Sequence, residues 1–182
     1  MKLLSSTRNK IILLLLITLL VFTGWQAGLE TVYAKLVVST TNYTLDVIKD
    51  DTRIEYKRKS KSSEAYEFVV FTRIDGRKGN YPQEVGGILQ PFVIILSWQL
   101  FLFFVLKRRQ AFQSLGVNFA VYLLIQIVFL ILLTGYYNST VQEYFFTLML
   151  DSFYIIALIL IIKDNMLYPV FRKKVIVKGN QQ

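Results

Sequence analysis

Four long apolar blocks, separated by polar segments, constrain this chain more than any other feature. They cover residues 11–29, 88–106, 117–137 and 144–162. A helix needs about 20 mostly apolar residues to cross a bilayer. Within the blocks, apolar residues do not alternate with polar ones as in a barrel strand, and a helix satisfies its own backbone hydrogen bonds in lipid. We therefore expect a mainly α-helical membrane protein with four transmembrane helices.

The basic residues predict how these helices are oriented. Segments 1–10, 107–116 and 163–182 hold 11 of the 21 Lys and Arg residues and a single acid, Asp164. Segment 30–87 has ten basic residues against nine acids, and segment 138–143 has no base. Lys and Arg near span ends stay cytoplasmic. This bias predicts a multi-pass protein of the bacterial inner membrane, with both termini inside and segments 30–87 and 138–143 outside.

The net charge of +9 raises the question whether the chain binds nucleic acid. The positive-inside pattern explains the basic tails more simply, because such tails fix topology and contact anionic lipid headgroups. We expect the lipid bilayer and an integral membrane protein as partners, and no nucleic acid.

The first apolar block also has features of a signal peptide. A basic start precedes the apolar core, and "VYA" at 32–34 offers a cleavage site. However, the stretch between the core and this site is long for a cleavage region, and Trp25 suits an interfacial anchor. We expect an uncleaved span. Cleavage would leave three spans and the same cytoplasmic C-terminus.

The outer segment 30–87 predicts a small antiparallel β structure between the first two helices. Alternating apolar residues indicate strands in "NYTLDVI" (42–48), "RIEY" (53–56) and "AYEFVVFTRI" (65–74). The sequence "DGRKGN" is expected to close the last strand, and Pro82 to break any regular structure after it. The start of the segment could alternatively continue the first helix. For "KRKSK" (57–61), a solvated hairpin tip is favoured over a site for phosphate or acidic glycan.

The chain has no cysteine and no histidine, which removes the usual nucleophiles, bases and metal ligands. The acids do not form a pair suited to acid and base roles, since Asp50 and Asp51 fall on an expected turn. We expect no catalytic, metal-binding or cofactor-binding residues, and therefore not an enzyme.

Asp151 is the only charged residue in the fourth block, and a carboxylate in lipid requires a partner. Such a residue costs roughly 2.5–3.5 kcal/mol on insertion scales. Ser97 and Gln99 in the second block and Gln126 in the third lie at similar depths. We predict that these four residues form an intramembrane polar cluster that joins the helices. The alternative is a proton or ion site at Asp151, which would make the chain a small transport component.

Helical spacing predicts which residues share the packed side of the fourth helix with Asp151. These are Thr147, Leu148, Tyr154 and Ile155, whereas Met149 and Ile156 should lie further round. Trp98 lies mid-span rather than at an interface, where Trp is usual. It predicts a packed surface, within the chain or towards a partner.

The plan of the chain is one span, a short outer strand segment, three further spans and a basic tail. Together with "GGILQPFVIILSWQLFLFFVLKRR" and the closing "LYPVFRKK", this plan resembles the small accessory membrane proteins of exosortase and archaeosortase systems. The resemblance implies a helper in protein sorting or surface-polysaccharide export, with an exosortase-type enzyme as partner. Exosortases depend on membrane Cys, Arg and His residues, so the chain itself is not the peptidase. The hypothesis is a non-catalytic accessory subunit of a cell-envelope complex.

Overall fold

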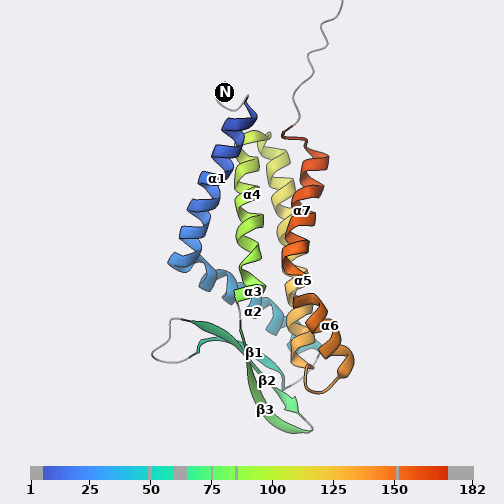
Figure 1. Ribbon diagram of the computed structural model, residues 1–182. Coiled ribbons are helices and arrows are strands. Elements are labelled where there is room, and N and C mark those ends of the chain that lie inside the picture. The colour runs from blue at the N-terminus through green and yellow to red at the C-terminus, as the bar shows by residue number, and fades with distance from the viewer. Residues whose placement is uncertain are drawn as a thin grey trace, which may run out of the picture.

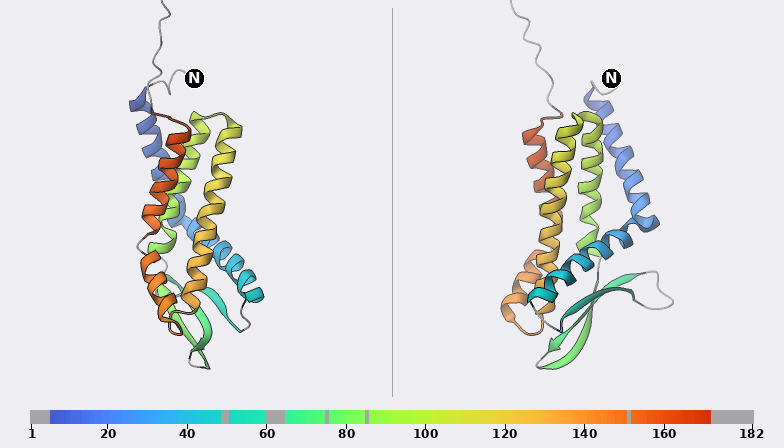
Figure 2. Two further views of the ribbon diagram at one scale, coloured as in Figure 1. Left: turned by 90° about the vertical axis from the view of Figure 1, so that its right-hand side faces the viewer. Right: turned by 180° about the vertical axis from the view of Figure 1, so that it is seen from behind.

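A computed structural model describes residues 6–48, 51–59, 65–74, 76–84, 86–150 and 152–171. The fold is a bundle of upright helices with a small sheet beneath one end, and helix α2 runs obliquely between the two (Figures 1 and 2). The mainly helical fold with a small antiparallel sheet is therefore confirmed.

The bundle is made by α1 (Thr7–Gly24), α4 (Pro91–Val105), α5 (Arg108–Thr134) and α7 (Phe153–Leu167). Among the described residues, three helices are long and apolar enough to cross a membrane, within Thr7–Ile48, Gly87–Val105 and Arg108–Thr134. A fourth span exists if α6 (Thr140–Leu150) and α7, which are bent by 55° to one another, cross together. The short helix α3 (Gly86–Leu89) leads into α4, where Pro91 occupies the first turn.

The first helix does not end where the apolar block ends. A π-helical turn, Trp25–Leu29, joins α1 to α2 (Glu30–Ile48), and Gly28 within it has φ of 122°. Only glycine adopts this conformation without strain. The turn redirects the chain so that α2 runs obliquely across the end of the bundle nearest the sheet (Figure 2). The alternative that segment 30–87 begins as a helix is correct, although a kink separates this helix from the first.

The strand predicted at 42–48 is wrong, because these residues form the end of α2. Leu45 is fully buried, whereas Tyr43 and Val47 are 76% and 80% exposed. The alternation of apolar residues therefore did not mark one buried face. Burial against α5 and β1 stabilises the helix. The motif at 32–34 also lies inside α2, with Tyr33 and Ala34 buried.

The sheet contains β1 (Arg53–Arg58), β2 (Tyr66–Ile74) and β3 (Arg77–Glu84), antiparallel in that order. The first two lie where the sequence predicts strands. The expected break at Pro82 is wrong. Pro82 pairs with Val69 on an edge strand, where a missing N–H group need not disturb the ladder. The loop "KRKSK" lies partly outside the described residues.

The other edge of the sheet is occupied by a side chain. The amide of Asn42 on α2 donates to the Ile54 carbonyl at 2.9 Å and accepts from the Ile54 N–H at 2.9 Å. This pair of bonds imitates a neighbouring strand at one position. Exposed edges invite pairing with other chains, and a covering element prevents it. Asn42 therefore both anchors β1 to α2 and closes part of its edge.

Two helix boundaries differ from the expected ones in ways that matter for the site. Helix α5 begins at Arg108, inside the loop expected at 107–116, and α7 continues to Leu167, into the tail expected at 163–182. Lys163 and Asp164 are therefore helical. Their polarity suggested a tail, but both contact polar groups of the neighbouring helices.

Candidate functional site

A buried carboxylate joins three helices of the bundle. Asp164, near the end of α7, is completely buried. Its oxygen Oδ2 accepts hydrogen bonds from Trp98 Nε1 at 3.1 Å and Gln99 Nε2 at 2.9 Å, both on α4. It also accepts one from Asn118 Nδ2 on α5 at 2.7 Å. One carboxylate oxygen therefore connects α4, α5 and α7.

Lys163 completes this network from the bundle surface. Its Nζ lies 3.2 Å from Asp164 Oδ1 and donates to Asn118 Oδ1. Asn118 thus donates to the carboxylate and accepts from the ammonium. The described side-chain groups that contact the Asp164 carboxylate are all hydrogen-bond donors, which matches the acceptor capacity of its oxygens. We call Trp98, Gln99, Asn118, Lys163 and Asp164 the Asp164 network.

Aromatic and small residues enclose the Asp164 network. Trp98 packs against Phe101 and Phe171, with ring centroids 5.5 and 6.4 Å away. On α5, the buried residues Ala111 and Ser114 share the face of Asn118. Such burial strengthens charge-assisted hydrogen bonds and makes their loss costly. Gln99 Oε1, Ser114 Oγ and Asp164 Oδ1 are buried and have no hydrogen-bond partner among the described residues, although Oδ1 forms the ion pair with Lys163.

A second polar network joins helices nearer the sheet. The Tyr33 hydroxyl of α2 donates to Gln126 Oε1 at 2.5 Å, and Gln126 Nε2 donates to the Ile88 carbonyl of α3 at 2.9 Å. Tyr33 also stacks on Phe92, with ring centroids 4.0 Å apart. This network holds α2 and α3 against α5, beside the kink at Gly28.

The structure divides the residues of the predicted polar cluster between separate sites. Gln99 belongs to the Asp164 network and Gln126 to the second network, while the Ser97 hydroxyl donates to the Val93 carbonyl of its own helix at 2.7 Å. Trp98 is buried and packs within the chain. Asp151 lies outside the described residues, so its partner stays a prediction.

The packed side of the last helices differs from the predicted one. Thr147, Leu148, Tyr154 and Ile155 are exposed. The buried residues are instead Phe146 on α6 and Phe153, Ala157, Leu160 and Asp164 on α7. Met149 and Ile156, expected further round, are partly buried against the core. The prediction failed because it assumed that Asp151 and the nearby hydroxyls define the packed face, whereas large apolar side chains do.

Sequence reasoning missed Asp164, although a signal for it exists. Phe153, Ala157, Leu160 and Asp164 are spaced at four, three and four residues, the repeat of one helix face. On α5, Ala111, Ser114 and Asn118 follow the same rule. Because Lys163 and Asp164 were assigned to a basic tail, the predicted helix ended before Asp164 and its buried face was missing the last residue.

The hydrogen bonds of this site connect helices to one another. Within the described part of the chain, no group of three or more His, Cys, Asp or Glu side chains is placed to hold a metal ion. The carboxylate is surrounded by donors from amides, an indole and an ammonium, which orient it and fix the helices.

No protein-family model, curated protein or solved structure matches this chain significantly.

Proposed function

We propose that this chain is a non-catalytic, multi-pass accessory subunit of a bacterial cell-envelope complex. The observation that carries the proposal is the Asp164 network. Its fully buried carboxylate uses its hydrogen bonds to tie α4, α5 and α7 together. Polar bonds of this type organise helices in a membrane. The proposed partner is an integral membrane enzyme of the exosortase type, which would supply the catalytic residues for sorting or polysaccharide export.

The outer faces of the helices support a place in the bilayer. Leu15, Leu16, Leu19 and Leu20 on α1 are 59–70% exposed, and Ile155, Leu158, Ile159 and Ile162 on α7 are 48–59% exposed. A soluble protein rarely exposes apolar residues over such contiguous areas. Lipid and a membrane partner are the surroundings that suit these faces.

The positions of the two described chain ends support four crossings. Both ends lie at the end of the bundle away from the sheet (Figure 1), where Lys10 Nζ donates to the Val170 carbonyl at 2.6 Å. An even number of crossings returns the chain to its starting side, which requires α6 and α7 to act as one span. With the basic bias of the termini, this arrangement favours cytoplasmic ends and an outer sheet.

Cysteine labelling tests this topology cleanly, because the chain has no cysteine of its own. Asn80→Cys lies on β3 and Gln110→Cys near the start of α5. In intact cells, or in spheroplasts where an outer membrane intervenes, a membrane-impermeant thiol reagent is expected to label position 80 and spare position 110. Permeabilised cells are expected to show both labelled. Labelling of 110 alone before permeabilisation would reverse the proposed orientation.

The proposed role is tested against the transport alternative through Asp151→Asn, which keeps hydrogen bonding and removes titration. In membranes of the source cell, we expect the tagged chain to migrate in a complex with the envelope enzyme, and Asp151→Asn to preserve that complex and its activity. The purified chain is also reconstituted into liposomes that contain a pH-sensitive dye. We expect the proton flux into these liposomes to be no larger than the flux into protein-free liposomes. Proton flux that Asp151→Asn abolishes would instead establish the transport role.

A further inference from the structure

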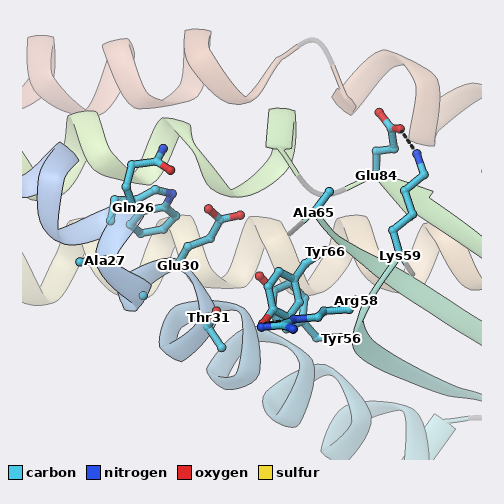
Figure 3. Close-up of a pocket in the computed structure, with 12 residues that line it drawn as sticks. Gln26, Ala27, Glu30, Thr31, Tyr56, Arg58, Lys59, Ala65, Tyr66 and Glu84 are labelled. Atoms are coloured by element: carbon cyan, nitrogen blue, oxygen red, sulfur yellow. Dashed lines mark hydrogen bonds and ion pairs between the residues drawn. The ribbon is translucent and has the colours of Figure 1, made fainter. Parts of the chain in front are cut away.

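A polar cleft opens between the kinked helix and the sheet, away from the Asp164 network. It has a volume of about 640 Å³ and is lined by the Trp25–Leu29 turn, the start of α2 and the neighbouring ends of the strands (Figure 3). This volume is in the range of small-molecule sites. The cleft exists because Gly28 lets α2 turn away from α1 and across the sheet.

The cleft carries opposite charges on its two sides. Glu30 projects from the first turn of α2, while Arg58 and Lys59 project from the end of β1 (Figure 3). Lys59 forms an ion pair with Glu84 at 2.9 Å, so these two charges offset one another. Glu30 forms no ion pair with the described residues. The lining is therefore neutral overall, with a carboxylate that lacks a counter-charge on the helix side.

Aromatic residues hold the strand side in place. The rings of Tyr56 and Tyr66 are stacked, with centroids 4.8 Å apart. Arg58 lies over the Tyr66 ring at 5.7 Å, and its Nε donates to the Tyr66 hydroxyl at 3.2 Å. The guanidinium is thus oriented before any ligand binds, which lowers the entropic cost of binding. Tyr56 borders the same cleft and adds an aromatic ring to its lining.

The position of the cleft depends on α1 and α2, and rests on the membrane placement proposed above. The 18 residues of α1 span about 27 Å at 1.5 Å each, close to the roughly 30 Å hydrocarbon core. The exposed surface of α2 divides into an apolar stripe and a polar stripe. The apolar stripe contains Val32, Leu36, Tyr43 and Val47, and the polar stripe contains Lys35, Ser39 and Asp46. Such a helix lies in the membrane interface, which puts the cleft at headgroup level.

We propose that this cleft binds a zwitterionic amine–phosphate headgroup, of the kind carried by phosphatidylethanolamine. The ammonium would contact Glu30 and the face of Tyr56, because carboxylates and aromatic rings both attract cations. The phosphate would contact Arg58, whose planar fork suits phosphate oxygens. A purely anionic headgroup would contact Arg58 but would also face the Glu30 carboxylate, which repels it. The same chemistry is present in a soluble phosphoamine, and the experiment distinguishes these two sources.

The test measures binding to the full-length chain in detergent by native mass spectrometry. The probes are a short-chain phosphatidylethanolamine, a phosphatidylglycerol with the same chains, and glycerophosphoethanolamine without chains. We expect the first to bind most tightly. Glu30→Gln and Arg58→Gln are each expected to weaken its binding about tenfold, the scale of one charge-assisted hydrogen bond. Glu143→Gln and Arg77→Gln remove exposed charges outside the cleft and should leave binding unchanged.

The outcomes separate the possibilities. Two results together would overturn the proposal in favour of simple anion binding. Phosphatidylglycerol would bind as tightly as phosphatidylethanolamine, and Glu30→Gln would leave the binding unchanged. Equally tight binding of glycerophosphoethanolamine would support the zwitterion site and assign it to a soluble ligand. Arg58→Lys keeps the positive charge but loses the planar fork that suits phosphate oxygens. It provides a milder variant, also expected to weaken phosphatidylethanolamine binding, if Arg58→Gln elutes as misfolded protein. A failure of this binding leaves the topology labelling and the complex unaffected, so it is distinguishable from failure of the proposed function.

Discussion

Asp164→Ala is expected to lower the free energy of unfolding by about 3 kcal/mol, the scale of breaking a buried charge pair. The change removes the shared acceptor of Trp98, Gln99 and Asn118. Three buried donors then lack a partner, and the Lys163 ammonium loses its counter-charge. Each unsatisfied group costs free energy because water cannot easily replace the lost bond.

This change can be measured by unfolding the purified chain from mixed micelles and monitoring its helicity. Asp164→Asn keeps the shape of the side chain and one acceptor oxygen, so it is expected to be less damaging than alanine. Asp46→Ala removes an exposed acid on α2 and serves as the control. A loss for Asp164→Ala no larger than about 0.6 kcal/mol, the average for one interhelical hydrogen bond, would show that the carboxylate does not hold the three helices.

Phe153→Ala is expected to destabilise the bundle by about 2 kcal/mol through the cavity that it leaves. The Phe153 ring is fully buried and lies 4.9 Å from the Phe129 ring and 6.1 Å from the Tyr122 ring, centroid to centroid. In a bilayer the apolar transfer term is small, since lipid tails are themselves apolar. The lost packing contacts therefore account for most of the effect.

The neighbouring substitution Ile155→Ala is the matched control, because Ile155 is 59% exposed on the same helix. It is expected to leave the unfolding midpoint in mixed micelles nearly unchanged. The pair also decides which side of α7 is packed. If Ile155→Ala lowered the stability more than Phe153→Ala, the packed face of α7 would be the one predicted from the position of Asp151.

The sequence predicted those parts of the fold in which local pattern and final burial agree. The strand at Tyr66–Ile74 is rich in β-branched and aromatic residues, and it forms the centre of the sheet. Long apolar blocks likewise became helices. In both cases each residue type suits its element before any tertiary contact forms.

The remaining parts depend on contacts between distant residues. Residues 42–48 have strand-like alternation, but packing on α5 and β1 makes them helical. Strand β3 has little strand propensity and forms because β2 offers a hydrogen-bonding edge along its length. Asp164 is polar, yet its partners on α4 and α5 are 46 to 66 residues away in the chain. Local pattern contains no direct information about such pairings.

The Asp164 network has a consequence for how the protein is made. Trp98 and Gln99 precede their acceptor by 66 and 65 residues, and translation at about 5–20 residues per second separates them by roughly 3–13 seconds. Until Asp164 is made, the Trp98 indole and the Gln99 carboxamide, joined later by the Asn118 carboxamide, lack the carboxylate that accepts their hydrogen bonds. An insertase or membrane chaperone that shields polar groups can bind these side chains during this time. Insertion of α7 then replaces that factor with the Asp164 carboxylate. Newly made chains truncated before Lys163 should therefore remain associated with such a factor, whereas full-length chains are released.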